Sequence, residues 1–391
     1  MFDAESVSAL RRQFPVTERL TWFNHAGVGP LSAPTAQAVA EFAVRAAREG
    51  EVPFPEAEAM VEECRARLGR LLRVPAESVG FTPNTSSGIL LAIGALEWRA
   101  GDNVILMEDD FPTVTYPFRL MLPGVERRTV TSAELVEDPA VVFAHADERT
   151  RMVALSWVHF LTARRFDIEA IVRFCRERGI ISVIDSIQGI GVVDCDWSAV
   201  DADFVVSHGA KWLLSPQGSG FVQVRAETMA GLRPVNHGWL SADWREFNDI
   251  FSEKPLRAGA ARFEPGTRNY LGICGLNAGL ELWERYGTAA VEARVRALVA
   301  RLRAGLEAAG FETVTPAEPE RSGAFITCRR PGACSASIHA WLRAGGFVCA
   351  LRENLLRVAP HCYNTEEEVD RFVARAADPA ALTAPPSDCK T

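Results

Sequence analysis

Short apolar runs alternate with amphipathic segments through the first two thirds of the chain. Five runs have the length of buried strands: residues 103–107, 152–156, 181–184, 204–206 and 220–224. Between two of these runs, residues 167–178 follow a helical period and stop at Gly179, where a glycine can close a helix. Strands separated in this way by helices predict an α/β fold with a mostly parallel sheet covered by helices.

The pattern changes beyond about residue 271. A long helical segment extends to about residue 306, and short strands are predicted near residues 325–327, 347–349 and 355–358. A final helix is expected at 366–376. We therefore predict an N-terminal segment (1–25) packing near the active site, a large domain (26–270), a small C-terminal α+β domain (271–378) and a mobile tail (379–391).

Composition narrows the class of protein. The chain has 391 residues, 48% of them hydrophobic and 24% charged, which fits a globular protein with two packed regions. A net charge of −8 without a basic cluster argues against a nucleic-acid partner. The N-terminus lacks a signal-peptide pattern, and no apolar stretch approaches the roughly 20 residues needed to span a bilayer. Nine cysteines without a CxxC pair suggest unpaired thiols and no metal site, so we expect a cytoplasmic protein.

The clearest chemical signal is a lone lysine downstream of a strand-end carboxylate. Asp185 ends one of the apolar runs, and Lys211 follows the next. A lysine amine can form a Schiff base with the aldehyde of pyridoxal 5'-phosphate, while an aspartate keeps the pyridine nitrogen protonated so that the ring accepts electrons. The pair predicts this cofactor.

The flanks of both residues resemble those of class V aminotransferase-fold enzymes, which include cysteine desulfurases, isopenicillin N epimerase and kynureninase. The matching segments are Val183-Ile184-Asp185-Ser186-Ile187-Gln188-Gly189 and Lys211-Trp212-Leu213-Leu214-Ser215-Pro216-Gln217-Gly218. The resemblance implies fold type I of the pyridoxal-phosphate-dependent transferases. That fold has a large domain with a mostly parallel sheet and a smaller C-terminal α+β domain.

The cofactor phosphate is expected at the start of a helix after residues 81–84. Free backbone N–H groups and hydroxyls meet there, although an ordinary helix cap has the same pattern. By position in the resembling family, Thr85 and Ser86 bind the phosphate. His208 stands where relatives often have a phosphate-binding serine. Ala210 replaces the histidine that many relatives carry before the lysine, and the effect of this replacement stays open.

The resemblance also suggests the contacts of the cofactor ring. Phe111 is expected to stack on the ring, the alternative being a side chain that fills the core. Gln188 and His159 are candidates to hydrogen-bond the phenolic oxygen, although a lone histidine is often structural. The turn at Gly266 and Thr267 resembles one that reaches the phosphate from a neighbouring subunit, which implies a homodimer with shared active sites.

Substrate binding is expected from an arginine, whose planar fork holds a carboxylate at two points. Arg357 lies in Leu356-Arg357-Val358-Ala359-Pro360-His361-Cys362-Tyr363-Asn364-Thr365, which resembles the α-carboxylate-binding segment of the family. Ala26 and Gly27 resemble the N-terminal segment that closes over the substrate.

These residues predict an enzyme acting on an α-amino acid through a Cα carbanion. A lyase that catalyses β-elimination, of the C–S lyase kind, is our preferred interpretation. Class V aminotransferase, amino-acid epimerase and non-catalytic cofactor-binding protein are alternatives. Cysteine desulfurase is disfavoured, because Cys349 lies in an apolar strand pattern rather than in a mobile loop.

Overall fold

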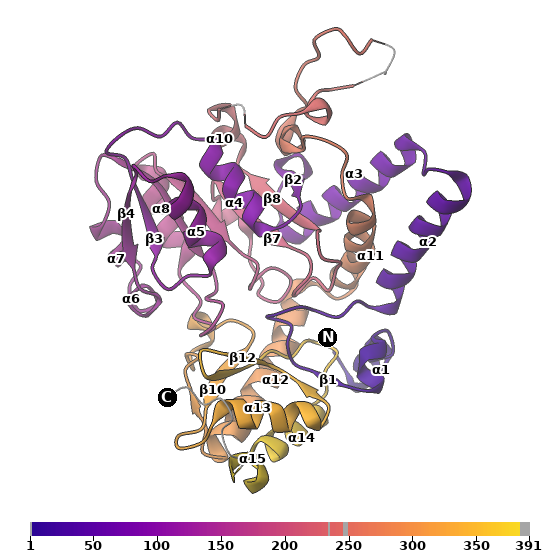
Figure 1. Ribbon diagram of the computed structural model, residues 1–391, viewed down its shortest axis with the longest axis vertical. Helices are drawn as coiled ribbons and strands as arrows, with labels where there is room; N and C mark the ends of the chain where they lie inside the picture. Colours follow the sequence, from indigo (N-terminus) through magenta and orange to yellow (C-terminus); the bar gives the residue numbers. More distant parts are fainter. Residues whose placement is uncertain (1, 234, 245–248, 384–391) are drawn as a thin grey trace.

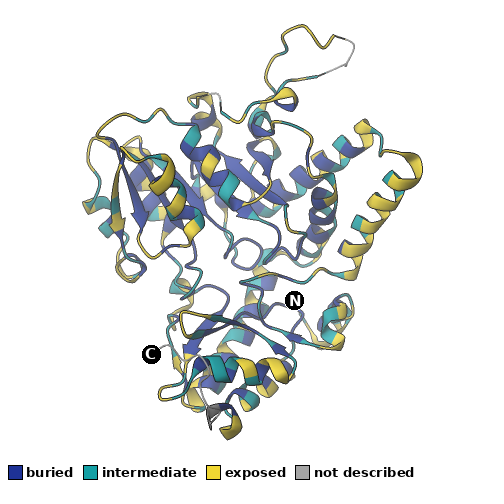
Figure 2. Ribbon diagram, in the orientation of Figure 1, coloured by how far each residue is buried: buried dark blue, intermediate teal, exposed yellow. Residues whose placement is uncertain are grey.

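The computed structural model describes residues 2–233, 235–244 and 249–383. It contains a large domain and a smaller C-terminal domain, seen in the upper and lower parts of Figure 1. The central strands of the large domain are buried, whereas the edge strand β4 (Glu126–Val130) is mostly exposed (Figure 2). The predicted tail falls partly outside this range, but residues Pro379–Thr383 form helix α15 and so do not belong to an unstructured tail.

A seven-stranded sheet forms the centre of the large domain. Its order is β2 (Val79–Thr82), β8 (Gly220–Val224), β7 (Phe204–His208), β6 (Ile181–Asp185), β5 (Thr150–Ser156), β3 (Asn103–Met107) and β4 (Glu126–Val130). Only β8 is antiparallel to its neighbours. The five predicted strands are confirmed, and the carboxyl ends of the other six strands lie at one edge of the sheet.

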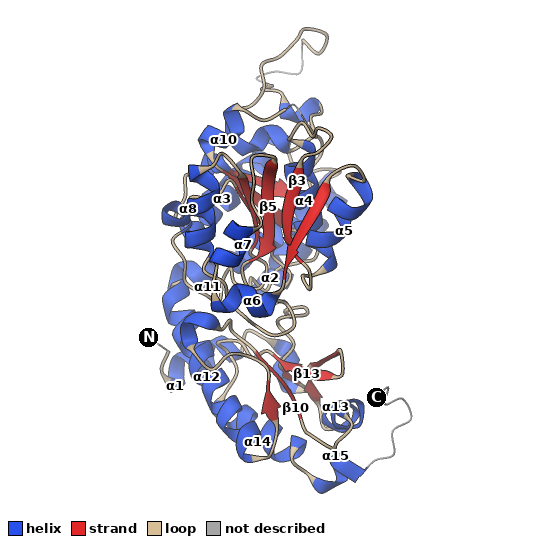
Figure 3. Ribbon diagram, turned by 90° about the vertical axis from the view of Figure 1, so that its left-hand side faces the viewer, coloured by secondary structure: helices blue, strands red, loops and turns tan. Residues whose placement is uncertain are grey.

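Helices cover both faces of this sheet (Figure 3). One face packs against α4 (Thr85–Gly94), α5 (Pro112–Met121) and α10 (Ala226–Ala230). The other packs against α3 (Phe54–Leu72), α8 (Ile168–Glu177), α9 (Trp197–Val200) and α11 (Tyr270–Tyr286). The remaining helices of this domain are α2 (Ala33–Glu49), α6 (Ser132–Glu137) and α7 (Ala140–Ala144).

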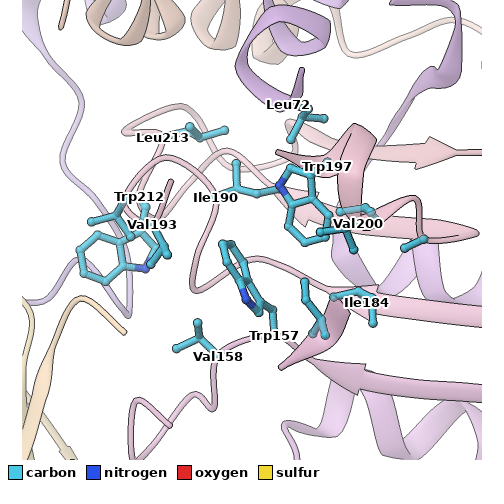
Figure 4. Close-up of a cluster of buried hydrophobic side chains, with 14 of the residues drawn as sticks. Leu72, Trp157, Val158, Ile184, Ile190, Val193, Trp197, Val200, Trp212 and Leu213 are labelled. Carbon is cyan, nitrogen blue, oxygen red and sulfur yellow. The ribbon is translucent and has the colours of Figure 1, made fainter. Parts of the chain in front are cut away.

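Tryptophans fill the second face near the edge where the strands end. Trp157 and Trp197 meet edge to face with ring centroids 5.1 Å apart, and Trp212 lies in the same cluster (Figure 4). Trp157 is buried, and a Cβ added to Gly189 would lie 2.2 Å from its ring. This dense packing fixes the backbone on both sides of Asp185 and Lys211.

The small domain is an antiparallel sheet against helices. The strand order is β12 (Ala350–Arg352), β13 (Leu355–Val358), β10 (Ile326–Arg329) and β9 (Glu312–Thr313). Its apolar face packs against α12 (Thr288–Ala308), α13 (Ser335–Ala344) and α14 (Glu366–Ala376). The N-terminal segment, which contains α1 (Ala4–Arg11), joins this domain because β1 (Thr21–Trp22) pairs with β11 (Phe347–Val348).

The predicted domain boundary at residue 270 is wrong. The single long helix expected there is two helices, α11 and α12, separated at Gly287, which has a φ of 76°. Helix α11 packs against α2 and α3 and contributes Ile273, Leu276 and Leu280 to the core of the large domain. The small domain therefore begins after Gly287.

Composition led to three expectations: no metal site, no membrane-spanning segment and unpaired cysteine thiols. Among the described residues, no group of three or more histidines, cysteines or carboxylates is placed to hold a metal ion. Within the same ranges, none of the helices combines the length and apolar character that crossing a bilayer demands. The expectation of unpaired thiols fails at Cys334, which is disulfide-bonded.

Candidate active site

The loops that leave the strands bring the predicted site residues to one edge of the sheet. Asp185 ends β6, Lys211 follows β7, Phe111 follows β3 and Thr85 follows β2. Ligands of α/β proteins bind at the carboxyl ends of parallel strands, because the connecting loops and helix N-termini meet there. The four residues come from four separate connections and meet only in the folded chain.

Lys211 lies against an aromatic ring and between charges of opposite sign. Its Nζ is 5.7 Å from the centre of the Phe111 ring. Burial lowers the pKa of the Lys211 amine to about 8; Asp185 opposes this shift and the positive charge of Arg357 adds to it. A sizeable fraction of the amine is therefore neutral near pH 8, as a nucleophile or base must be.

Asp185 is buried, and its carboxylate accepts a 3.0 Å hydrogen bond from the backbone N–H of Ile187. Burial raises its pKa to about 6, while the Ile187 N–H and Lys211 act in the opposite direction. The group is still mainly ionised at neutral pH. A buried carboxylate of this kind can hold a proton on a facing ring nitrogen.

A second buried carboxylate, Asp110, lies close enough to interact with Asp185. It accepts hydrogen bonds from Ser156 N (2.8 Å), Ser156 Oγ (2.6 Å) and Phe111 N (2.7 Å). Burial, together with the charge of Asp185, raises its pKa to about 7. Asp110 thus ties the loop that carries Phe111 to the end of β5, which is paired with Asp185 through Ser156.

The first turn of α4 has the properties of an anion site. Asn84 caps the helix by accepting from Ser87 N at 3.0 Å, and Thr85 and Ser86 follow at the first turn. The Thr85 hydroxyl oxygen is buried without a hydrogen-bond partner among the described residues. An unpaired buried hydroxyl at a helix N-terminus fits a phosphate group, which accepts hydrogen bonds from both.

His208 lies at the end of β7 with one ring nitrogen engaged. Its Nε2 accepts a 3.0 Å hydrogen bond from Gly218 N, so the neutral ring carries its proton on Nδ1. Burial and the nearby Lys211 lower its pKa to about 4. The residue is positioned as a neutral donor, which agrees with a role beside a phosphate.

Phe111 does not fill the core. Its side chain is 42% exposed, and its ring meets that of Phe160 edge to face with centroids 5.2 Å apart. An exposed ring beside Lys211 is available to stack on a flat cofactor.

His159 and Gln188 have partners within the protein. His159 donates from Nε2 to the carbonyl of Asp109 and accepts at Nδ1 from Thr162. Both ring nitrogens are therefore engaged, which contradicts the expectation that His159 hydrogen-bonds a cofactor oxygen and favours a role in holding the Asp109 loop. Gln188 donates to Ala26 O at 3.0 Å and accepts from Trp212 Nε1 at 2.9 Å, and its second amide hydrogen has no partner among the described residues.

Arg357 reaches the site from the small domain. It is buried, its Nη1 donates to the carbonyl of Phe160 at 2.6 Å, and its Nε has no partner among the described residues. Burial and the charge of Arg352 lower its pKa to about 10. No described carboxylate forms a salt bridge with it, so an incoming carboxylate finds an uncompensated guanidinium.

The N-terminal segment that contains Ala26 and Gly27 contacts the lysine loop. Gly29 donates to Ala210 O at 2.8 Å, and a Cβ at Gly29 would lie 2.2 Å from the carbonyl oxygen of Lys211. His25 donates to Ala359 O and accepts from the Tyr363 hydroxyl, both at 2.8 Å. One short segment thus connects the loops that carry Lys211 and Arg357.

The turn at Gly266 and Thr267 lines a cavity of about 480 Å³ together with Ser87 and Gly218. Neither Lys211 nor Arg357 lines that cavity. A role at the cofactor would come from a second subunit, as the resemblance implies.

Cys349 is a packed thiol. It is buried in the small-domain core, and burial raises its pKa to about 12. The connection from β12 to β13 consists only of Glu353 and Asn354, with φ angles of 45° and 58°. A two-residue turn leaves no room for a mobile cysteine loop before Arg357.

Sequence reasoning missed Asp110, Phe160 and Gly29. Asp110 directly precedes Phe111 and follows a buried strand, so its position at a carboxyl edge was the available signal. Phe160 contributes its backbone carbonyl, and Gly29 contributes the absence of a side chain. Neither property leaves a chemical signature in a sequence.

Comparisons with known proteins agree with this geometry. Residues 34–372 match the family model described as Aminotransferase class-V. A probable cysteine desulfurase from Methanothermobacter thermautotrophicus is 27% identical over 92% of this chain and 94% of the relative. Isopenicillin N epimerase from Streptomyces clavuligerus is 28% identical over 88% of this chain and 91% of the relative. The solved complex of the cystine C–S lyase C-DES with its product cysteine persulfide has a TM-score of 0.86 at 23% identity, covering 94% and 99% of the two chains.

Proposed function

Because the chain belongs to the aminotransferase class V family, whose members are pyridoxal 5'-phosphate-dependent enzymes, we propose that it is a lyase that eliminates a sulfur-containing leaving group from Cβ of an amino acid. The observation that carries the proposal is the meeting of Lys211, Asp185 and Arg357 without an accessible thiol. Each of the free cysteines in the described ranges has a raised thiol pKa, and none is exposed. A desulfurase needs a thiolate that attacks the substrate sulfur, and these thiols are protonated at neutral pH.

The residues of the candidate site can bind the cofactor. Thr85, Ser86 and His208 would contact its phosphate, Phe111 its ring face and Asp185 its ring nitrogen. When bound, pyridoxal 5'-phosphate supplies an electron-accepting ring that stabilises negative charge at Cα.

The protein's own groups account for binding and proton transfer. Arg357 holds the α-carboxylate through charge-assisted hydrogen bonds, which orients the amino acid with Cα near Lys211. The neutral Lys211 amine accepts the Cα proton, and its depressed pKa of about 8 suits that role near neutral pH. The leaving group departs from Cβ with the electron pair of the C–S bond. Hydrolysis of the remaining fragment gives a keto acid and ammonia.

The surroundings of Cys349 support elimination over desulfurase chemistry. C-DES shares the fold over almost the whole chain. A desulfurase requires a mobile cysteine thiolate that attacks the substrate sulfur. The short β12–β13 turn and the packed Cys349 do not provide one. Transfer of the amino group to a keto acid is the competing reaction.

Product analysis decides between them. The purified protein, loaded with the cofactor, is incubated with L-cystine, S-substituted cysteines and other amino acids, with and without a keto-acid acceptor. Release of pyruvate and ammonia without an acceptor is expected. Turnover only with an acceptor would instead show an aminotransferase. Lys211→Ala is the control, and it should abolish both turnover and the covalent attachment of the cofactor seen by mass spectrometry after borohydride reduction.

A further inference from the structure

We propose that Arg352, together with Arg357, selects substrates that carry a second anionic group on the side chain, such as a distal carboxylate. This inference rests on the proposed function for the identity of the site, but its geometry comes from the small-domain sheet alone. Arg357 would bind the α-carboxylate, and Arg352 would bind the second anion of the same ligand.

The register of the sheet places both arginines on one face. Ala350 pairs with Arg357, and Arg352 pairs with Leu355, so all four residues point to the same side. Arg352 and the diagonally placed Arg357 are then about 7–8 Å apart at the backbone. Both side chains are long enough to reach one ligand from such positions.

This face points toward the large domain. Thr327, the partner of Arg357 on β10, donates from its hydroxyl to Leu161 O, and Arg357 donates to Phe160 O. The opposite face carries Leu356 and Val358, which are part of the small-domain core. Figure 1 shows β12 on the side of the small domain nearer to the large domain.

The two positive charges are uncompensated among the described residues. Arg352 is exposed, and its only described hydrogen bond is to the carbonyl of Leu351. No described acidic side chain forms a salt bridge with Arg352 or Arg357. Arg329, also on this sheet, is paired with Glu312 at 3.1 Å. Two neighbouring arginines that lack a described acidic partner form a local positive charge on a chain with a net charge of −8, and such a charge attracts anions.

The Arg352–Arg357 doublet acts on the catalytic groups. The charge of Arg352 contributes to the lowered pKa of Arg357, and the charge of Arg357 contributes to the lowered pKa of Lys211. A substrate with two anionic groups would neutralise both arginines. A substrate with a neutral side chain would leave the Arg352 charge without a partner, which costs affinity relative to the dianionic substrate.

Calorimetric titration of the holoenzyme tests whether Arg352 binds a second anionic group, and it does not require turnover. The ligands are glutarate, with two carboxylates, and valerate, with one carboxylate and the same number of carbons. The variants are Arg352→Gln, the charge-conserving Arg352→Lys and the matched control Arg329→Gln. We expect wild-type protein to bind glutarate more tightly than valerate, and Arg352→Gln to lose about tenfold in glutarate affinity with valerate unchanged. Arg352→Lys should keep part of the preference, and Arg329→Gln all of it.

Two results would overturn the inference: equal losses for glutarate and valerate in Arg352→Gln, or no loss for either. Failure of the proposed function would look different. In that case, the loaded protein would release no keto acid from any amino acid, while the Arg352-dependent preference for glutarate would persist. Elimination could instead be equally fast from cysteines with a neutral S-alkyl group and from substrates with a second anionic group, and unchanged in Arg352→Gln. That result would support the lyase function and reject the preference for a second anionic group.

Discussion

At the scale of single residues, burial of Lys211 should leave a measurable signature in the protein without cofactor. Its folded-state pKa is about 8, whereas the usual value is 10.5. The unfolded chain therefore binds more protons between these pH values, and stability must rise with pH there. Below pH 8 the charged amine remains as a cost to the folded state.

We predict that the free energy of unfolding of the wild-type apoprotein, relative to Lys211→Met, rises by up to about 3 kcal/mol between pH 8 and 10.5. Urea denaturation of both proteins across this range measures the difference. Parallel stability curves would show that the lysine amine is not buried as described.

At the scale of elements, the N-terminal segment and the lysine loop touch through backbone. Because a Cβ at Gly29 would collide with the carbonyl oxygen of Lys211, we predict that Gly29→Ala displaces the loop and weakens cofactor binding at least tenfold. Equilibrium dialysis of the cofactor measures the effect. Gly124→Ala is the matched control, because nothing lies within 4 Å of a Cβ built there. Equal affinities in the two variants would refute the contact.

The turn between β12 and β13 gives a second prediction. Glu353 has a φ of 45°, where a β-branched side chain is strained. We expect Glu353→Val to be less stable than Glu353→Gly by about 1–2 kcal/mol in urea denaturation. Since this turn holds Arg352 opposite Leu355, the valine variant should also lose glutarate affinity. Retention of both properties would mean that another conformation of the turn is available.

At the scale of the whole molecule, we predict a homodimer in which Gly266 and Thr267 complete the site of the partner. Light scattering should give a mass of two 42.8 kDa chains. Exposed apolar side chains on α5, among them Leu120 and Met121, agree with a covered surface.

Mixing of inactive variants tests the sharing of sites. In a mixed dimer, the defects of Lys211→Ala and Thr267→Asp fall in the same site, because Thr267 completes the partner's site, so the other site is intact. Random mixing of the two chains should restore about a quarter of the wild-type sites. Lys211→Ala mixed with Asp185→Ala is the control and should restore none, because both residues belong to the same subunit's pocket. Absence of restoration in the first mixture would argue for sites contained in one chain.

The elements and the reactive groups could be identified from the sequence alone. Apolar runs of strand length are local features, and they predicted β3, β5, β6, β7 and β8 within a few residues. Asp185 ends such a run, Lys211 follows one and Arg357 lies within one, so their chemistry could be inferred before their positions were known.

Features that depend on residues distant in the sequence became defined only in the folded chain. Asp110 becomes a buried carboxylate beside Asp185 only when β3 and β5 are adjacent, and both ring nitrogens of His159 are engaged only because Asp109 and Thr162 are near. The observed domain boundary differs from the predicted one because α11 packs against α2 and α3 of the large domain. Arg352 joins Arg357 through strand pairing. Burial, hydrogen-bond partners and strand register are properties of pairs of segments, and a single sequence specifies them only through the folded chain.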